Sequence, residues 1–199
     1  MASHNDDAEK HLSQADAVMA KLIAAHPPYP AAEREYQPFQ ALVTAIISQQ
    51  LSFKAAATIK NRVLGIVPSF TPEGFLAVTP EALRGAGLSG AKARYIMELA
   101  ARASDGRIDF DVLLKQSDAE AMATLVALPG IGKWTAEMFL MFSLNRPDIL
   151  SLGDVALQRA VRLLYGEGVS LEQVGQAWSP YRSVASWYLW RHAEVKPTA

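Results

Sequence analysis

The sequence of 199 residues contains no cysteine. This absence excludes a disulfide-stapled fold, thiolate zinc sites, iron–sulfur clusters and catalysis by a cysteine nucleophile. Long apolar runs are also missing, because stretches such as 41–47 fall far short of the roughly 20 residues that span a bilayer. The first ten residues are polar and acidic, which fits neither a secretory signal nor a transit peptide. We therefore expect a cytoplasmic protein with no membrane partner.

The chain has little excess charge of either sign, with 19 Lys and Arg against 20 Asp and Glu. This balance argues at first against nucleic acid as a partner. The distribution is uneven, however, because segments 39–65 and 83–96 each contain three basic residues and no acidic one. Residues 1–38 carry six acidic and three basic residues instead. A polarised surface of this kind is compatible with DNA binding through the two basic segments.

Half of the residues are hydrophobic, as in an ordinary globular domain. Apolar residues recur every three or four positions along most of the chain, which is the period of an α-helix. One such series comprises Phe39, Leu42, Val43, Ile46 and Ile47. Capping signals such as Thr79-Pro80-Glu81 and Ser117-Asp118-Ala119-Glu120 mark helix starts. No stretch shows the alternation of a strand. The sequence predicts an all-α fold of about nine or ten helices.

The organisation of the chain favours a single catalytic domain, residues 1–199, made of two lobes. Residues 39–146 form the most hydrophobic block and are expected to make the first lobe. Residues 1–38 and 147–199 are expected to pack together as the second lobe, with a cleft between the two.

Two glycine-containing segments imitate nucleotide-binding motifs. Residues 85–90 match G-x-G-x-x-G, but a capped helix precedes them where a dinucleotide fold needs a strand. We expect a corner between helices, with glycine at positive φ. Gly132-Lys133 lacks two fixed positions of a P-loop, which are Ala127 and Trp134 here. The histidines His4, His11, His26 and His192 lack metal-ligand spacing, so we expect structural or solvent roles and no metal site.

The most informative segment is LVALPGIGKWTA, residues 125–136. It predicts a helix, a tight Leu-Pro-Gly-Ile-Gly hairpin and a second helix. Two glycines let the backbone approach a phosphate, and the free N–H groups of a helix start favour negative charge. The alternative is an ordinary corner between helices. The segment resembles the helix-hairpin-helix element, which grips a DNA backbone without reading sequence. The resemblance implies DNA contacts through Leu128, Gly130, Ile131, Gly132 and Lys133.

Asp154 follows a glycine at the predicted start of a later helix, where an aspartate alone would be interpreted as an N-cap. A hairpin followed about 20 residues later by Gly-Asp resembles the helix-hairpin-helix superfamily of DNA glycosylases. Its alkylation-repair branch, the DNA-3-methyladenine glycosylase II family, is the most similar. The resemblance runs from about residue 39 to residue 191. It includes AIISQQLS at 45–52, GLSGAKAR at 87–94 and WSPYRS at 178–183.

The resemblance implies a role for several residues. Asp154 is the implied catalytic carboxylate, which stabilises the oxocarbenium-like sugar and helps position water; a helix start would favour its ionised form. Strand-cleaving relatives have a lysine where this chain has Trp134, which implies a monofunctional enzyme. Trp134 and Tyr181 match base-pocket aromatics, although core packing is the alternative for each. Met138 stands where the longer enzyme has an aromatic residue, and we place it in the same base pocket.

Gln50 falls where the family inserts a side chain into the gap left by a flipped base. The longer enzyme has leucine there, whereas a glutamine could hydrogen-bond the orphaned partner base. The alternative is a polar residue at the end of a helix. We expect Gln50 and its neighbour Gln49 to contact DNA.

The expected function is therefore a monofunctional DNA glycosylase that hydrolyses the N-glycosidic bond of 3-methyladenine and 7-methylguanine in base excision repair. One alternative is a glycosylase for uracil, hypoxanthine or ethenoadenine, and another is a non-enzymatic DNA-binding module. The expected partner is double-stranded DNA with a damaged base, and the protein is expected to be a monomer associated with the nucleoid. We expect no cofactor, although the resemblance implies a monovalent cation at the hairpin carbonyls.

Overall fold

The structure is a computed structural model that describes residues 4–30 and 37–194. Within these ranges the regular structure is entirely helical, which confirms the all-α prediction. The described ranges contain thirteen helices rather than nine or ten. Two helices that the sequence does not predict, Pro72–Leu76 and Phe110–Lys115, are only five and six residues long, too short to reveal a helical period. Within the described ranges, no helix combines the length and apolarity that crossing a bilayer requires.

The chain divides into two compact units. Unit 1 comprises residues 1–34 and 145–199, and unit 2 comprises residues 35–144. Each has its own packed helices. That the chain works as a single catalytic domain, with a cleft between lobes, stays a prediction.

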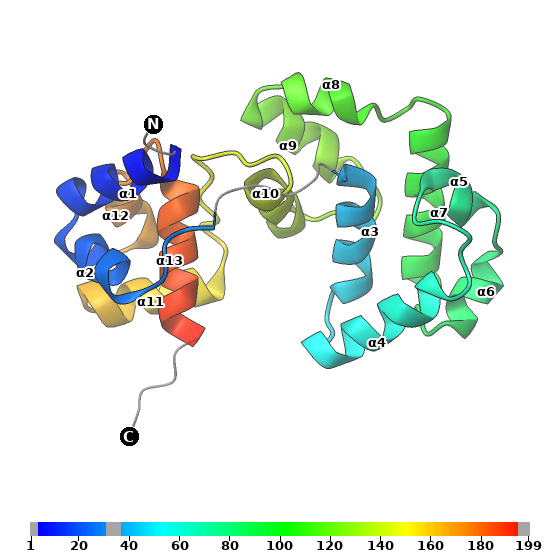
Figure 1. Ribbon diagram of the computed structural model, residues 1–199, viewed down its shortest axis with the longest axis horizontal. Coiled ribbons are helices and arrows are strands. Elements are labelled where there is room, and N and C mark those ends of the chain that lie inside the picture. The colour runs from blue at the N-terminus through cyan, green and yellow to red at the C-terminus, as the bar shows by residue number, and fades with distance from the viewer. Residues whose placement is uncertain (1–3, 31–36, 195–199) are drawn as a thin grey trace. The chain divides into compact units, whose positions relative to one another are not determined.

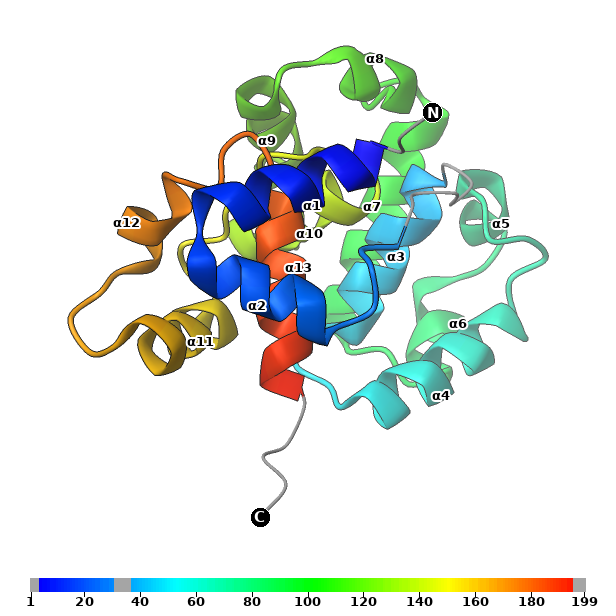
Figure 2. The same ribbon diagram turned by 60° about the vertical axis from the view of Figure 1, so that its left-hand side comes forward.

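Unit 1 is built around its last helix, which packs against three others (Figures 1 and 2). Its helices are α1 (His4–Ala15), α2 (Ala17–Ala25), α11 (Val155–Tyr165), α12 (Leu171–Gly175) and α13 (Arg182–Glu194). Helix α13 contacts α1, α2 and α11, so the two ends of the chain share one core. Buried aromatic and aliphatic side chains fill this core, among them Leu12, Met19, Leu157, Val161, Trp178, Tyr188 and Leu189.

Unit 2 contains the remaining eight helices, which are consecutive in the chain (Figure 1). They are α3 (Pro38–Ser48), α4 (Phe53–Leu64), α5 (Pro72–Leu76), α6 (Pro80–Gly85), α7 (Gly90–Ser104), α8 (Phe110–Lys115), α9 (Asp118–Val126) and α10 (Lys133–Phe142). Helix α7 packs against α3, α5 and α6, and α10 packs against α9 and α3. The apolar series predicted from residue 39 onward is the buried face of α3.

The local signals in unit 2 act as the sequence predicts. Thr79 caps α6, and Ser117 forms a capping box with Glu120 at the start of α9. The G-x-G-x-x-G segment is the corner between α6 and α7, where Gly87 adopts φ +109°. A helix precedes this corner, which excludes the dinucleotide-binding interpretation.

Candidate active site

Asp154 lies at the start of α11 and is buried, with 7% of its surface exposed. Its Oδ1 accepts a hydrogen bond of 2.9 Å from the backbone N–H of Leu157, as expected for an N-cap. The same oxygen accepts a bond of 3.2 Å from the indole Nε1–H of Trp190 on α13. The carboxylate is therefore oriented by two donors from two helices, and it stands at the positive end of the α11 dipole.

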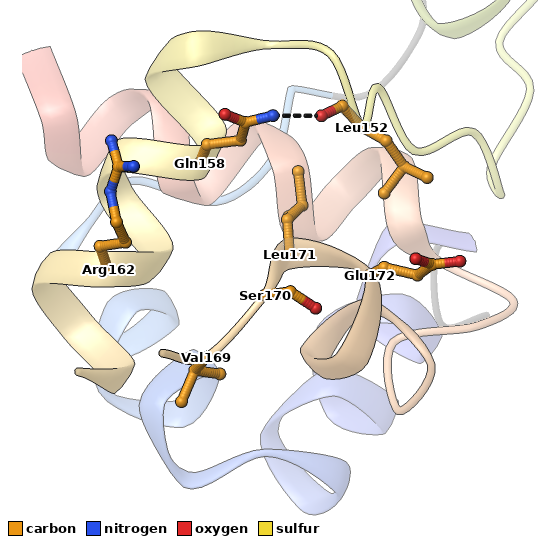
Figure 3. Close-up of a pocket in the computed structure, with 7 residues that line it drawn as sticks. All are labelled: Leu152, Gln158, Arg162, Val169, Ser170, Leu171 and Glu172. Carbon is orange, nitrogen blue, oxygen red and sulfur yellow. Dashed lines mark hydrogen bonds between the residues drawn. The ribbon is translucent and has the colours of Figure 1, made fainter. Parts of the chain in front are cut away.

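The backbone leading to Asp154 is held by a side chain of the helix that follows it. Gln158 Nε2 donates a hydrogen bond of 2.6 Å to the carbonyl of Leu152. Figure 3 shows this bond at the edge of a pocket of about 310 Å³ between α11 and the start of α12. The backbone N–H of Asp154 donates to the carbonyl of Ser151 at 3.1 Å. These bonds fix the turn at Leu152 and Gly153 that delivers the carboxylate.

A second carboxylate in this segment, Asp148, is occupied by an ion pair. Arg182 donates from Nε and Nη2 to the two carboxylate oxygens at 2.7 and 2.8 Å, and Ser179 Oγ donates at 2.9 Å. Burial works against the charge of Asp148, but the bonds from Arg182 and Ser179 outweigh it and lower its pKa. Ser183 Oγ also donates to the carbonyl of Arg146 at 2.6 Å. Asp148 therefore ties the segment to the start of α13.

Tyr181, a predicted base-pocket residue, lies just before α13 and is half-buried. Its ring packs edge-on against the ring of His11, with centroids 5.4 Å apart. The structural or solvent role expected for His11 stays a prediction. His26 and His192 contact each other at the surface, whereas the side chain of His4 lies outside the described part of the chain.

The hairpin lies between α9 and α10, as the sequence predicts. Gly130 adopts φ +82°, and a Cβ atom there would collide with the ring of Tyr95. Only glycine fits this position. The side chains of Leu128 and Ile131 are buried, so they anchor the hairpin and leave only their backbone for a ligand. Gly132 is exposed at the N-cap of α10, next to the free N–H groups of the first turn.

The first two turns of helix α10 contain the three residues that bear on the reaction type and the base pocket. Trp134 is 54% exposed, an unusual position for so large an apolar ring. Met138 lies one turn further along the same helix and is half-buried. Lys133 is exposed, and its Nζ lies 3.9 Å from Oε1 of the buried Glu137. Consecutive residues point about 100° apart on a helix, so Lys133 does not occupy the direction of Trp134.

The hairpin also offers neutral carbonyl oxygens, which are suitable ligands for a hard monovalent cation. Two of them are already engaged, because Leu128 O accepts from Ile131 N–H and Gly130 O accepts from Gln49 Nε2. This site stays a prediction.

The predicted site residues fall in both units. Asp154 and Tyr181 belong to unit 1, whereas Gln50, Trp134 and Met138 belong to unit 2. That these residues form one pocket stays a prediction.

A comparison with protein families gives the framework for these residues. Residues 43–175 match the HhH-GPD superfamily of base excision DNA repair proteins. The match spans the hairpin, Asp154 and most of unit 2. The chain belongs to this superfamily.

Individual members of the superfamily resemble the whole chain. It is 31% identical over 200 residues to DNA-3-methyladenine glycosylase 1 of Schizosaccharomyces pombe, covering 94% of this chain and 87% of the relative. The crystal structure of a DNA-3-methyladenine glycosidase from Bacillus halodurans matches with TM-score 0.85 and 39% identity, covering 98% of this chain and 92% of that one. The S. pombe glycosylase bound to abasic DNA matches with TM-score 0.82 and 30% identity, covering 95% and 97%. The prediction of a helix-hairpin-helix glycosylase of the alkylation-repair type is confirmed.

Sequence reasoning missed two residues that orient Asp154 in this member of the superfamily. Trp190 is 36 positions away along the chain, and no local motif marks it. Gln158 has a readable signal, since it lies four residues after Asp154 and therefore on the same face of α11.

Proposed function

We propose that this chain hydrolyses the N-glycosidic bond of alkylated purines in DNA, with Asp154 as the catalytic carboxylate. The observation that carries the proposal is the buried Asp154 side chain, aimed by Leu157 N–H and the Trp190 indole at the start of a helix. The alkylation-repair glycosylases among its relatives support the choice of substrate.

The chemistry follows from charge. As the bond between base and sugar breaks, positive charge develops on the sugar ring, and a fixed carboxylate stabilises it electrostatically. The base departs with the bonding electron pair. A water molecule attacks the sugar carbon and loses a proton to solvent, and the product is an abasic site. Leu157 and Trp190 both donate to Oδ1, so the carboxylate is already oriented before the reaction begins.

The proposed enzyme is monofunctional. A strand-cleaving mechanism needs an amine that forms a Schiff base with the sugar. Trp134 occupies the position where such relatives have lysine, and Lys133 pairs with Glu137 instead. Borohydride should therefore trap no covalent complex between the protein and DNA that contains a damaged base.

The proposed base pocket uses Trp134, Tyr181 and Met138. An alkylated purine with a positive charge stacks favourably on electron-rich rings, by roughly 0.5–2 kcal/mol. Such a base is already a good leaving group, so recognition by stacking needs no strong general acid. The ring of Trp134 is 54% exposed, which supports a role in this stacking.

The proposed substrate is double-stranded DNA, bound by the protein as a monomer at the nucleoid in the cytoplasm. The hairpin from Leu128 to Lys133 holds a phosphate through backbone N–H groups. Because few phosphates are contacted in this way, we expect only a moderate dependence of binding on salt.

The deciding experiment incubates the protein with methylated duplex DNA and identifies the released bases by chromatography and mass spectrometry. The wild type should release 3-methyladenine and 7-methylguanine. Asp154→Asn should lower the rate at least about a hundredfold, because the amide cannot offset the developing charge. Binding of an abasic-site duplex should persist in this variant.

A matched control is available in unit 2. Asp109 caps α8 through the N–H groups of Asp111 and Val112, and its side chain is exposed. Asp109→Asn makes the same chemical change at a helix start and should leave base release unchanged. Release of uracil, hypoxanthine or ethenoadenine without any methylated base would replace the proposal with the alternative glycosylase. DNA binding with no base release by the wild type would indicate a binding module.

A further inference from the structure

The turn that joins α3 to α4 contains Gln50, whose backbone is in the left-handed region with φ +57°. This conformation is uncommon for a residue other than glycine and costs of the order of 1 kcal/mol, so the surroundings must enforce it. The backbone N–H of Leu51 donates to the carbonyl of Ser48 at 3.2 Å and closes the turn. The side chain of Gln50 is exposed at the tip.

Lys92 holds this turn from the first turn of α7. Its Nζ donates hydrogen bonds of 2.8 Å to the carbonyl of Ile47 and 2.6 Å to the carbonyl of Gln49. These two carbonyls lie at the end of α3 and directly before Gln50, where a helix dipole is negative and favours a cation.

The two carbonyls are the hydrogen-bonding partners that stabilise the charge of Lys92. The side chain is half-buried, and burial lowers its pKa. Among the residues that the structure describes, Lys92 Nζ has two hydrogen-bond acceptors. Both are backbone carbonyls and neither is a carboxylate. A partly desolvated lysine kept without an acidic partner is unusual unless backbone groups replace the water.

Gln49 fastens the same turn to the hairpin. Its Nε2 donates a hydrogen bond of 2.8 Å to the carbonyl of Gly130. Gly130 is the glycine that contacts the Tyr95 ring and cannot be replaced without a collision. The turn before α4 is therefore attached to the hairpin at Gly130, and the side chain of Gln50 is left exposed.

We propose that Lys92 and Gln49 are positioning residues that hold Gln50 as a rigid wedge, so that it enters the base stack when a damaged nucleotide is extruded. The inference rests on the proposed glycosylase function. Lys92 fixes the two carbonyls that precede the strained residue, and Gln49 ties the same turn to the hairpin. If the turn were mobile, part of the binding free energy would be lost in ordering the turn, and less would remain to unstack a base.

The test compares substrates that do and do not need a wedge. Extrusion from a duplex requires unstacking and unpairing, whereas a single strand requires little of either. We expect Lys92→Met to lower release of 7-methylguanine from duplex DNA about tenfold, because two charge-assisted hydrogen bonds are lost. Release from the single strand should be unchanged. Gln49→Ala and Gln50→Ala should shift the duplex-to-single-strand ratio in the same direction.

Two further variants make the test specific. Lys92→Arg keeps a cation able to donate to two carbonyls and should restore most of the ratio. Lys115→Met removes an exposed lysine from the end of α8 and should leave the ratio at the wild-type value. Thermal unfolding of each variant checks that it is folded.

A readout without catalysis separates the inference from the proposed function. A duplex with 2-aminopurine opposite an abasic site fluoresces more strongly when a side chain unstacks the probe. Lys92→Met should weaken this signal at saturating protein. Equal loss of release from duplex and single strand, or a full fluorescence signal, would overturn the positioning role. Absence of base release from either substrate by the wild type would instead overturn the proposed function.

Discussion

Unit 1 and unit 2 hold polar groups in different ways. In unit 1, Asp16 accepts hydrogen bonds from the Tyr165 hydroxyl at 2.6 Å and the Trp178 indole at 2.8 Å. Asp154 similarly accepts from the Trp190 indole. In unit 2, side-chain nitrogens of Gln49 and Lys92 donate to backbone carbonyls.

The difference matches what each unit has to keep still. A carboxylate inside a core is stable only when its oxygens are hydrogen-bonded, and aromatic residues supply a donor together with apolar bulk. Three of the four tryptophans, at positions 178, 187 and 190, belong to unit 1. In unit 2 the predicted DNA-contacting turn and hairpin instead have backbone carbonyls that are held by side-chain donors. Side chains fix backbone carbonyls in both units, since Gln158 does so for Leu152 in unit 1. We infer that unit 1 in addition orients carboxylates with aromatic donors.

The strongest test of this contrast compares two helix-capping aspartates. Asp16→Ala should lower the free energy of unfolding by about 2 kcal/mol, because the half-buried Tyr165 hydroxyl and the buried Trp178 indole lose their acceptor. Asp109→Ala in unit 2 removes an exposed cap with backbone donors only and should cost about 1 kcal/mol. Urea unfolding followed by tryptophan fluorescence and circular dichroism measures both. Equal losses would break the contrast.

A second comparison uses the two glycines of the hairpin. Gly130→Ala should lower the free energy of unfolding by about 2 kcal/mol or more, because a positive φ is strained and the new methyl meets the Tyr95 ring. Gly132 has φ −84°, and no atom lies within 4 Å of the position that a methyl group would take, so Gly132→Ala should leave stability unchanged. Thermal unfolding of the two variants gives the answer. A tolerated Gly130→Ala would show that the hairpin is less constrained than we infer.

A third variant sharpens the role of aromatic donors in unit 1. Trp190→Phe keeps most of the packing but removes the N–H that reaches Asp154. We expect kcat for base release to fall about tenfold, since a hydrogen bond to a carboxylate is lost, while KM stays the same. Trp187→Phe is the control, because Trp187 packs against Tyr29 and Arg191 instead. A fall in both variants would indicate a general packing effect.

The smallest expected effect is on acid stability. Burial opposes the charge of Asp16, but bonds from Tyr165, Trp178 and two backbone amides outweigh it and lower its pKa. The pKa of Asp148 is lowered in the same sense by Arg182. The unfolded carboxyls therefore take up protons first, near pH 3.9. Stability from these groups is present above that pH and is lost as the pH falls through the lower folded values.

This acid response should also distinguish the units. Asp105 and Glu120 in unit 2 have lowered pKa values as well, through hydrogen bonds from Arg107 and Ser117, but both are exposed. Salt should screen their share and leave that of Asp16 and Asp148. Unfolding measured from pH 6 to pH 3 at about 0.5 M salt should be less steep for the Asp16→Asn, Asp148→Asn double variant than for the wild type. If stability fell equally steeply with pH in both proteins, Asp16 and Asp148 would not cause the acid response.

The sequence predicted much of this fold because its signals are local. Helix period placed the buried face of α3, and short motifs placed the caps of α6 and α9. The hairpin was readable because its Pro-Gly-Ile-Gly string constrains the backbone within a few residues. The short helices α5 and α8 escaped prediction because five or six residues do not complete two turns.

The sequence predicted the residues of the candidate site but not the residues that hold them in place. Asp154 was found because the hairpin and the Gly-Asp about 20 residues after it resemble the pattern of the glycosylase family. Trp190 and Lys92 were not found as supports, because each acts on a residue more than thirty positions away. Their side chains carry no motif that would indicate an indole donor or a lysine bound to carbonyls.

The sequence by itself therefore determined the helices, the hairpin and the candidate carboxylate, since backbone propensity and capping act over a few residues. Only the tertiary structure decided what holds them. It placed the Trp190 indole on Asp154, the Lys92 ammonium on the end of α3 and the Gln49 amide on Gly130. These contacts join distant parts of the chain, and packing of the surrounding helices, which no local pattern encodes, brings their atoms within hydrogen-bonding distance.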